Sequence, residues 1–179
     1  MYIGAMIFEG GGFLKPQTFF NILNANGALI ITACGLSLVM ITGSIDISVG
    51  GVVALVSMCC AVYLDFKGGN VFVSLLIALA IGLGFGLVQG FLVAYLDIQP
   101  FIVTLAGMFF ARGMTAIISK DMISITNETF MAWAKLKLYF PFGGYLNKKG
   151  VMIYPYIYPT VVIALILLVL AFIMLKFTK

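Results

Sequence analysis

The clearest apolar stretch of the chain limits what it can fold into. Residues 71–96 carry no charged side chain, whereas a helix of about 20 residues already crosses a hydrocarbon core roughly 30 Å thick. The stretch is apolar on every face, which excludes the alternating pattern of a membrane β-strand. Inside a bilayer, a helix satisfies its own backbone hydrogen bonds. This stretch therefore predicts a transmembrane helix.

Four other stretches have the same character: residues 27–42, 49–64, 100–119 and 160–175. Residues 1–14 are predicted to be the tail of a truncated first span, and residues 120–155 an extramembrane loop. Only 9% of the residues are charged and 63% are hydrophobic, whereas soluble domains have about 25% charged residues. The predicted fold class is all-α, a polytopic transmembrane helical bundle with about five spans plus the truncated first one.

Several functions are disfavoured by what the sequence lacks. It has no histidine, the commonest general base and metal ligand. The three cysteines, Cys34, Cys59 and Cys60, lie in apolar stretches without CxxC spacing and are interpreted as packing residues. The net charge of +4 comes without a basic block, so no nucleic-acid partner is predicted. We predict no catalytic residue, no metal site and no enzyme.

Small residues recur every fourth position within residues 71–96: Ala78, Gly82, Gly86, Gly90 and Ala94. On a helix they form one continuous face, and in lipid such faces let two helix backbones approach closely. The pattern predicts a helix-packing surface. Gln89 lies beside this face and either lines a polar pathway or forms a hydrogen bond across a helix interface.

Two apolar stretches that are shorter than a full span meet at GSIDISVGG, residues 43–51. Short helices around a glycine-rich junction are typical of a translocation pathway. Two ordinary helices joined by a tight turn would explain the same pattern, and both alternatives stay open. Farther along, Arg112 lies within an apolar stretch, where a charge is costly. We expect it to reach the membrane surface or to pair with a carboxylate, for which Asp46 is one candidate.

Two motifs carry a family resemblance. LVMITGSIDISVGG resembles TGGIDLSVGS, and GLVQGFLVAYLDIQPFIVTLAGMFFARG resembles the motif that follows it in permease subunits of bacterial ABC sugar importers. This is the ribose, xylose and galactoside family, and the galactofuranose-type permeases are the most similar. The resemblance covers residues 13–179. Ser44, Gln89 and Gln99 depart mildly from the pattern.

The resemblance implies a multi-pass protein of the bacterial cytoplasmic (inner) membrane that forms an alternating-access path for a simple sugar, namely a pentose, a hexose or galactofuranose. It implies that residues 1–179 are the N-terminal portion of one permease domain, without the C-terminal half that holds the ATPase-coupling loop. The loop at residues 120–155 would be external, against the positive-inside tendency.

The same resemblance implies several partners. They are a second permease copy or a paralogue, ATPase subunits, a solute-binding protein and the lipid bilayer. ATP and magnesium would be bound by the ATPase, and this chain would need no cofactor.

Three interpretations of Asp46 stay open. Its carboxylate, together with Ser48, could cap the helix that begins near Val49. It could accept hydrogen bonds from sugar hydroxyls, or it could relay protons. Asp46, Ser48 and Gln89 are the candidate translocation-path or substrate-contact residues. The alternative functions are half of a proton-coupled secondary transporter or channel that uses Asp46, and a membrane assembly subunit that does not transport.

Overall fold

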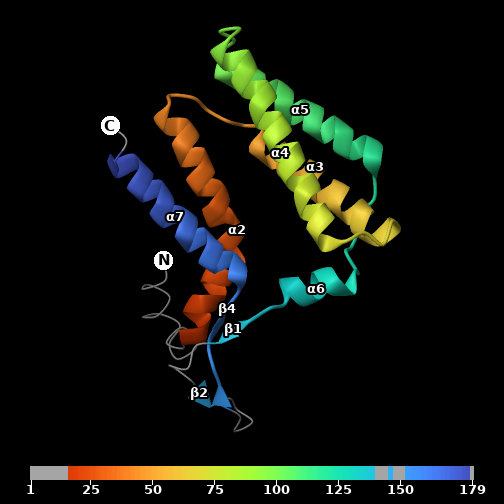
Figure 1. The fold of residues 1–179 in the computed structure, drawn as a ribbon, viewed down its shortest axis with the longest axis vertical. Coiled ribbons are helices and arrows are strands. Elements are labelled where there is room, and N and C mark those ends of the chain that lie inside the picture. The colour runs from red at the N-terminus through yellow and green to blue at the C-terminus, as the bar shows by residue number, and fades with distance from the viewer. Residues whose placement is uncertain (1–15, 140–144, 147–151, 178–179) are drawn as a thin grey trace, which may run out of the picture. The chain divides into compact units, whose positions relative to one another are not determined.

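The computed structural model describes residues 16–139, 145–146 and 152–177 (Figure 1). The helices are α2 (Pro16–Ile41), α3 (Val49–Ala61) with its π-helical extension η2 (Val62–Phe66), α4 (Val71–Ala94), α5 (Pro100–Ile118), α6 (Glu128–Ala134) and α7 (Pro159–Phe177). Among these described residues, five helical segments are long and apolar enough to cross a membrane, which confirms the predicted class. The predicted tail at residues 1–14 lies outside the described residues.

Helix α2 is longer than the sequence predicts. We expected it to begin near residue 27 because three asparagines precede that position, but it begins at Pro16. All three asparagine amides form hydrogen bonds within the protein: Asn21 Oδ1 accepts from Gln17 Nε2 at 2.5 Å, Asn26 Nδ2 donates to the Ile22 carbonyl at 2.8 Å, and Asn24 binds a distant segment. The hypothesis that a short helix precedes the junction is therefore wrong.

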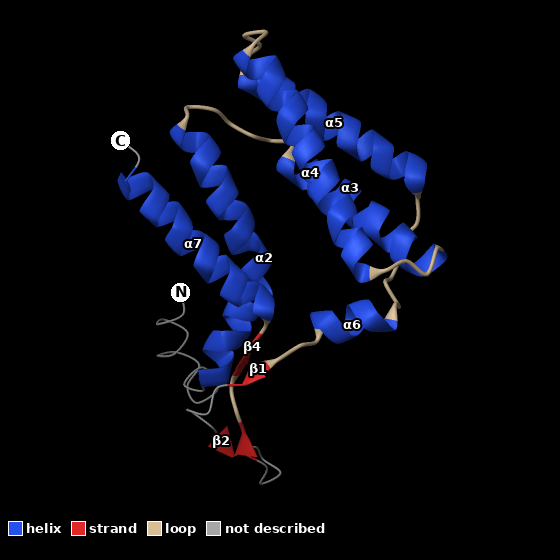
Figure 2. Ribbon diagram, viewed as in Figure 1, coloured by secondary structure: helices blue, strands red, loops and turns tan. Residues whose placement is uncertain are grey.

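The chain forms two compact units, and the first comprises Met1–Gly35 and Ala134–Lys179. Within it α2 packs against α7: a Cβ added to Gly27 would lie 3.2 Å from Val161 Cγ2, and Val161 is fully buried. The strands of this unit are short and antiparallel (Figure 2), with β1 (Leu138–Tyr139) paired to β4 (Tyr156–Ile157) and β2 (Tyr145–Leu146) paired to β3 (Met152–Ile153). The loop predicted at residues 120–155 therefore contains α6 and three of these strands.

Two side chains of α2 attach β4 to that helix. Asn24 Nδ2 donates to the Tyr156 carbonyl at 3.1 Å, and Asn24 Oδ1 accepts from the Tyr158 backbone N–H at 2.9 Å. The Tyr156 N–H donates to Gln17 Oε1 at 3.2 Å. These amides satisfy the backbone groups of an extended segment, as a neighbouring strand would.

The second unit, Leu36–Trp133, contains α3, α4 and α5 lying side by side (Figure 1). Its buried side chains are small or aliphatic, among them Leu55, Leu64, Val103 and Ala111. Helices α3 and α5 approach closely at Gly51, where an added Cβ would lie 3.0 Å from the Met108 carbonyl oxygen. Close packing at small residues is the usual means of association between helices in lipid.

The helix ends follow local rules. Gly43 ends α2 with φ +78° and donates its N–H to the Met40 carbonyl at 3.0 Å, as a glycine C-cap does. Asn70 caps α4 through a 3.0 Å hydrogen bond from the Phe72 N–H. Pro100 begins α5 at a position where its missing N–H costs nothing.

Candidate functional site

The segment between α2 and α3 is organised by the carboxylate of Asp46. Its Oδ1 accepts from the Ser48 backbone N–H at 2.8 Å and from the Ser48 hydroxyl at 2.7 Å. Ser48 is the N-cap of α3 and is only 2% exposed. Asp46 therefore orders the residue at the N-cap, and the Ser48 N–H is the backbone group at the start of the helix that donates to its carboxylate.

The Ser48 hydroxyl also lies 3.3 Å from Gln89 Oε1 on α4. A serine hydroxyl has one proton to donate. The shorter bond goes to a carboxylate and is charge-assisted, so the proton belongs to Asp46. With the amide of Gln89 turned end for end, Nε2 would donate to Ser48 and complete a chain from Gln89 through Ser48 to Asp46. The structure thus brings all three predicted path residues together.

The amide of Gln89 fits against α5 because residue 107 has no side chain. A Cβ on Gly107 would overlap Gln89 Nε2, and this nitrogen is buried without a hydrogen-bond partner. A buried donor without a partner costs roughly 1–3 kcal/mol, which favours the reversed amide orientation. The hydrogen bond between Ser48 and Gln89 crosses a helix interface, which is the second of the two predicted roles of Gln89.

Helix α5 also binds the junction directly. The Thr104 hydroxyl lies 3.1 Å from the Ile45 carbonyl and 3.3 Å from the Phe101 carbonyl, and Thr104 is 6% exposed. Thr104 and Gly107 were not among the residues predicted from the sequence. A usable signal was present, because Thr104, Gly107 and Ala111 recur at helical spacing as small residues on one face of α5.

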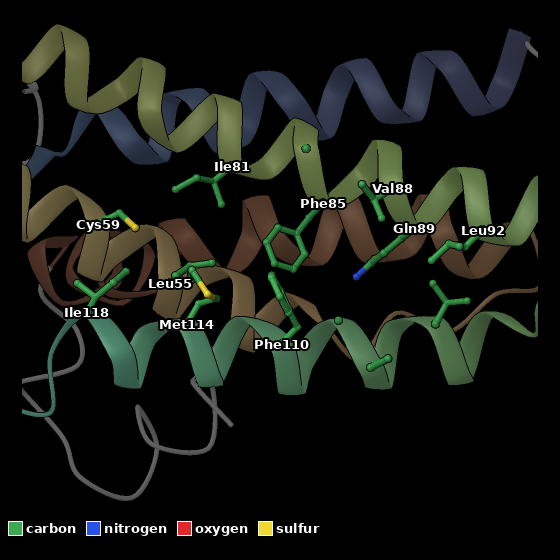
Figure 3. A pocket seen from close by; sticks show the side chains of 14 residues that line it. Leu55, Cys59, Ile81, Phe85, Val88, Gln89, Leu92, Phe110, Met114 and Ile118 are labelled. Atoms are coloured by element: carbon green, nitrogen blue, oxygen red, sulfur yellow. The ribbon is translucent and has the colours of Figure 1, made fainter.

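A groove of about 660 Å³ lies between α4 and α5 and reaches α3 (Figure 3). The Gln89 amide lines it, and Phe85 of α4 faces Phe110 of α5 with ring centroids 6.1 Å apart. Nearly all the lining side chains are apolar. Sugar hydroxyls in such a groove would lose water without replacement hydrogen bonds, so the sugar-contact hypothesis applies to the junction and not to the groove.

The small-residue face of α4 has no close neighbour within the described residues. A Cβ added at Gly82, Gly86 or Gly90 would meet nothing within 4 Å there. The contact of this face, which runs from Ala78 to Ala94, with another helix stays a prediction.

Arg112 lies on α5 beside a second, smaller groove. In the described part of the chain it forms no ion pair, so the proposed pairing with Asp46 is not present. Among residues 16–139, 145–146 and 152–177, no three His, Cys, Asp or Glu side chains gather closely enough to hold a metal ion.

These features define a polytopic helical membrane protein in which a polar junction before one spanning helix is bound by two others. Residues 18–179 match the family model described as "branched-chain amino acid transport system / permease component". The chain belongs to this family of permease components and is a multi-pass protein of the inner membrane.

Three relatives illustrate the similarity. The inner membrane ABC transporter permease protein YjfF of Escherichia coli is 35% identical over 79% of this chain and 43% of its own length. The ribose import permease protein RbsC of Escherichia coli is 35% identical over 73% of this chain and 40% of its own length. The fructose import permease protein FruF of Bifidobacterium longum is 37% identical over 69% of this chain and 35% of its own length.

The chain thus spans less than half the length of these relatives. No solved structure matches it. The predicted resemblance to sugar permeases is confirmed, and relatives of the galactofuranose type are among the matches, with the transporter permease protein YtfT of Escherichia coli 38% identical over 63% of this chain.

Proposed function

We propose that this chain is part of the membrane permease of an ATP-driven importer for a simple sugar. The observation that carries the proposal is the family match over residues 18–179, together with relatives named as ribose, fructose and galactofuranose permeases. The family description names branched-chain amino acids, so these compounds are the competing substrate class.

In this proposal the chain carries out no bond chemistry. It contributes spanning helices to a path that opens alternately to the two sides of the membrane. ATP and magnesium are bound by a separate ATPase, and a solute-binding protein delivers the sugar. A second permease copy or a paralogue completes the path.

The polar junction supports a role for Asp46 in that path. Oδ1 is occupied by Ser48, whereas Oδ2 forms no hydrogen bond within the described residues, and Asp46 is only half-buried. A carboxylate oxygen of this kind accepts well from a sugar hydroxyl. Ser48 and Gln89 would hold the carboxylate in place, and Asp46 would touch the sugar transiently.

Reconstituted transport tests the proposal. The full-length protein is incorporated into vesicles with its ATPase and solute-binding protein, and uptake of labelled ribose, fructose and galactofuranose is measured with and without ATP. We expect ATP-dependent uptake of at least one sugar, with no competition from leucine or isoleucine. Uptake of leucine alone would mean that the substrate is an amino acid and not a sugar.

The same vesicles separate the rival functions. A proton-coupled transporter would take up substrate along an imposed pH gradient without ATP, and a protonophore would abolish the uptake. An assembly subunit would bind its partners, yet neither ATP nor a pH gradient would produce uptake. Either result would contradict the importer proposal.

A further inference from the structure

A charged groove of about 420 Å³ lies on the surface of α3 and α5, separate from the apolar groove of Figure 3. Its apolar lining includes Ala54 and Met58 of α3. Its charged lining consists of Arg112 on α5 and of Lys120 and Asp121 in the turn that follows. Two cations and one anion thus line the groove together with apolar side chains, beside the middle of α3 and the C-terminal end of α5.

The hydroxyl groups beside this groove are already used. Thr115 donates to the Ala111 carbonyl at 2.8 Å. Ser119 Oγ donates to the Asp121 carbonyl and accepts from the Asp121 N–H, both at 3.1 Å. The latter pair fixes the turn that carries the neighbouring lysine. Recognition of a ligand is therefore left to the guanidinium, the ammonium and the carboxylate.

The depth of Arg112 sets the kind of ligand. Helix α5 has 19 residues and so spans about 28 Å, close to the hydrocarbon thickness of a bilayer. Arg112 lies about 9 Å before the helix end, by the rise of 1.5 Å per residue. A long arginine side chain at this depth extends toward the interface, where lipid phosphates lie.

We propose that this groove binds one phospholipid whose headgroup joins a phosphate to a primary ammonium, namely phosphatidylethanolamine. Arg112 and Lys120 bind the phosphate, Asp121 accepts hydrogen bonds from the ammonium, and an acyl chain lies along Ala54 and Met58. Phosphatidylglycerol offers no cation to Asp121. Phosphatidylcholine offers a quaternary ammonium, which has no N–H to donate.

Native mass spectrometry of the complete chain, released from nanodiscs with equal parts of these three lipids, tests the proposal. We expect one retained phosphatidylethanolamine. Arg112→Gln and Lys120→Gln should each lower its retention about tenfold, because each removes a charge-assisted hydrogen bond. Asp121→Asn should abolish the preference over phosphatidylglycerol without lowering the total of bound phospholipid.

Lys67→Gln is the matched control, because Lys67 is an exposed lysine in the turn after η2 and does not line the groove. It should leave retention unchanged. If Arg112→Gln fails to fold, the two variants in the exposed turn still decide the question. Equal retention of the three lipids would overturn the proposal. Unchanged retention of phosphatidylethanolamine in both Lys120→Gln and Asp121→Asn would also overturn it. Loss of a co-purifying permease partner from Arg112→Gln, with lipid retention intact, would assign the arginine to a protein interface instead.

Discussion

Replacing Gly51 with alanine tests the close contact between α3 and α5. The added Cβ would lie 3.0 Å from the Met108 carbonyl oxygen and 3.3 Å from Ala111 Cβ. The first obstacle is helix backbone, which cannot rotate away as a side chain does. Overpacking costs about 1–3 kcal/mol, whereas alanine gains about 1 kcal/mol over glycine within a helix. We expect a net loss near 1 kcal/mol, roughly a fivefold lower ratio of folded to unfolded protein.

The assay is the fraction of monodisperse protein that remains in detergent after heating over a series of temperatures. Gly82→Ala is the control, because its Cβ meets nothing within 4 Å among the described residues, and its stability should be equal or higher. Adding Ala111→Gly to Gly51→Ala should restore little, since the Met108 carbonyl remains in place. A Gly51→Ala protein as stable as Gly82→Ala would refute the packing of α3 against α5.

Three other substitutions probe separate features. Gly107→Ala should displace the Gln89 amide from Ser48 and lower stability by about 1 kcal/mol in the same heating assay. In a Gln89→Ala background the same substitution should not lower stability. An equal loss in that background would exclude this mechanism. Asn24→Ala should speed proteolysis of strand β4 about tenfold, because two backbone groups lose their partner, whereas unchanged cleavage would contradict the role of Asn24. Gly86→Val should weaken self-association or permease pairing in crosslinking, and undiminished crosslinking would remove the packing role of this face.

The sequence predicted the spanning helices well because in lipid the absence of charge is almost sufficient to define a helix. The ends that were predicted well have local causes, such as Gly43 closing α2 and Pro100 opening α5. The start of α2 was not predicted, because the hydrogen bonds that accommodate Asn24 come from residues far away in the sequence.

The candidate site was predicted as a set of residues and not as an arrangement. Asp46 and Ser48 are neighbours in sequence, so their interaction could be anticipated. The contact of Ser48 with Gln89 depends on the register of α4 against α3, which apolar periodicity does not determine. Gly107 mattered only once that register was known, because its role is to leave space for another side chain.

The hydrogen bonds between Asn24 and the β4 segment also have a consequence for the order of events during synthesis of the chain. Asn24 and Tyr158 are 134 residues apart in the chain, which a ribosome making about 5–20 residues per second covers in roughly 7–27 s. During that interval α2 is already made, but the backbone that its asparagine will bind is not. Until Tyr156 and Tyr158 have been made, the amide of Asn24 must stay hydrated at the membrane surface or form hydrogen bonds with other groups.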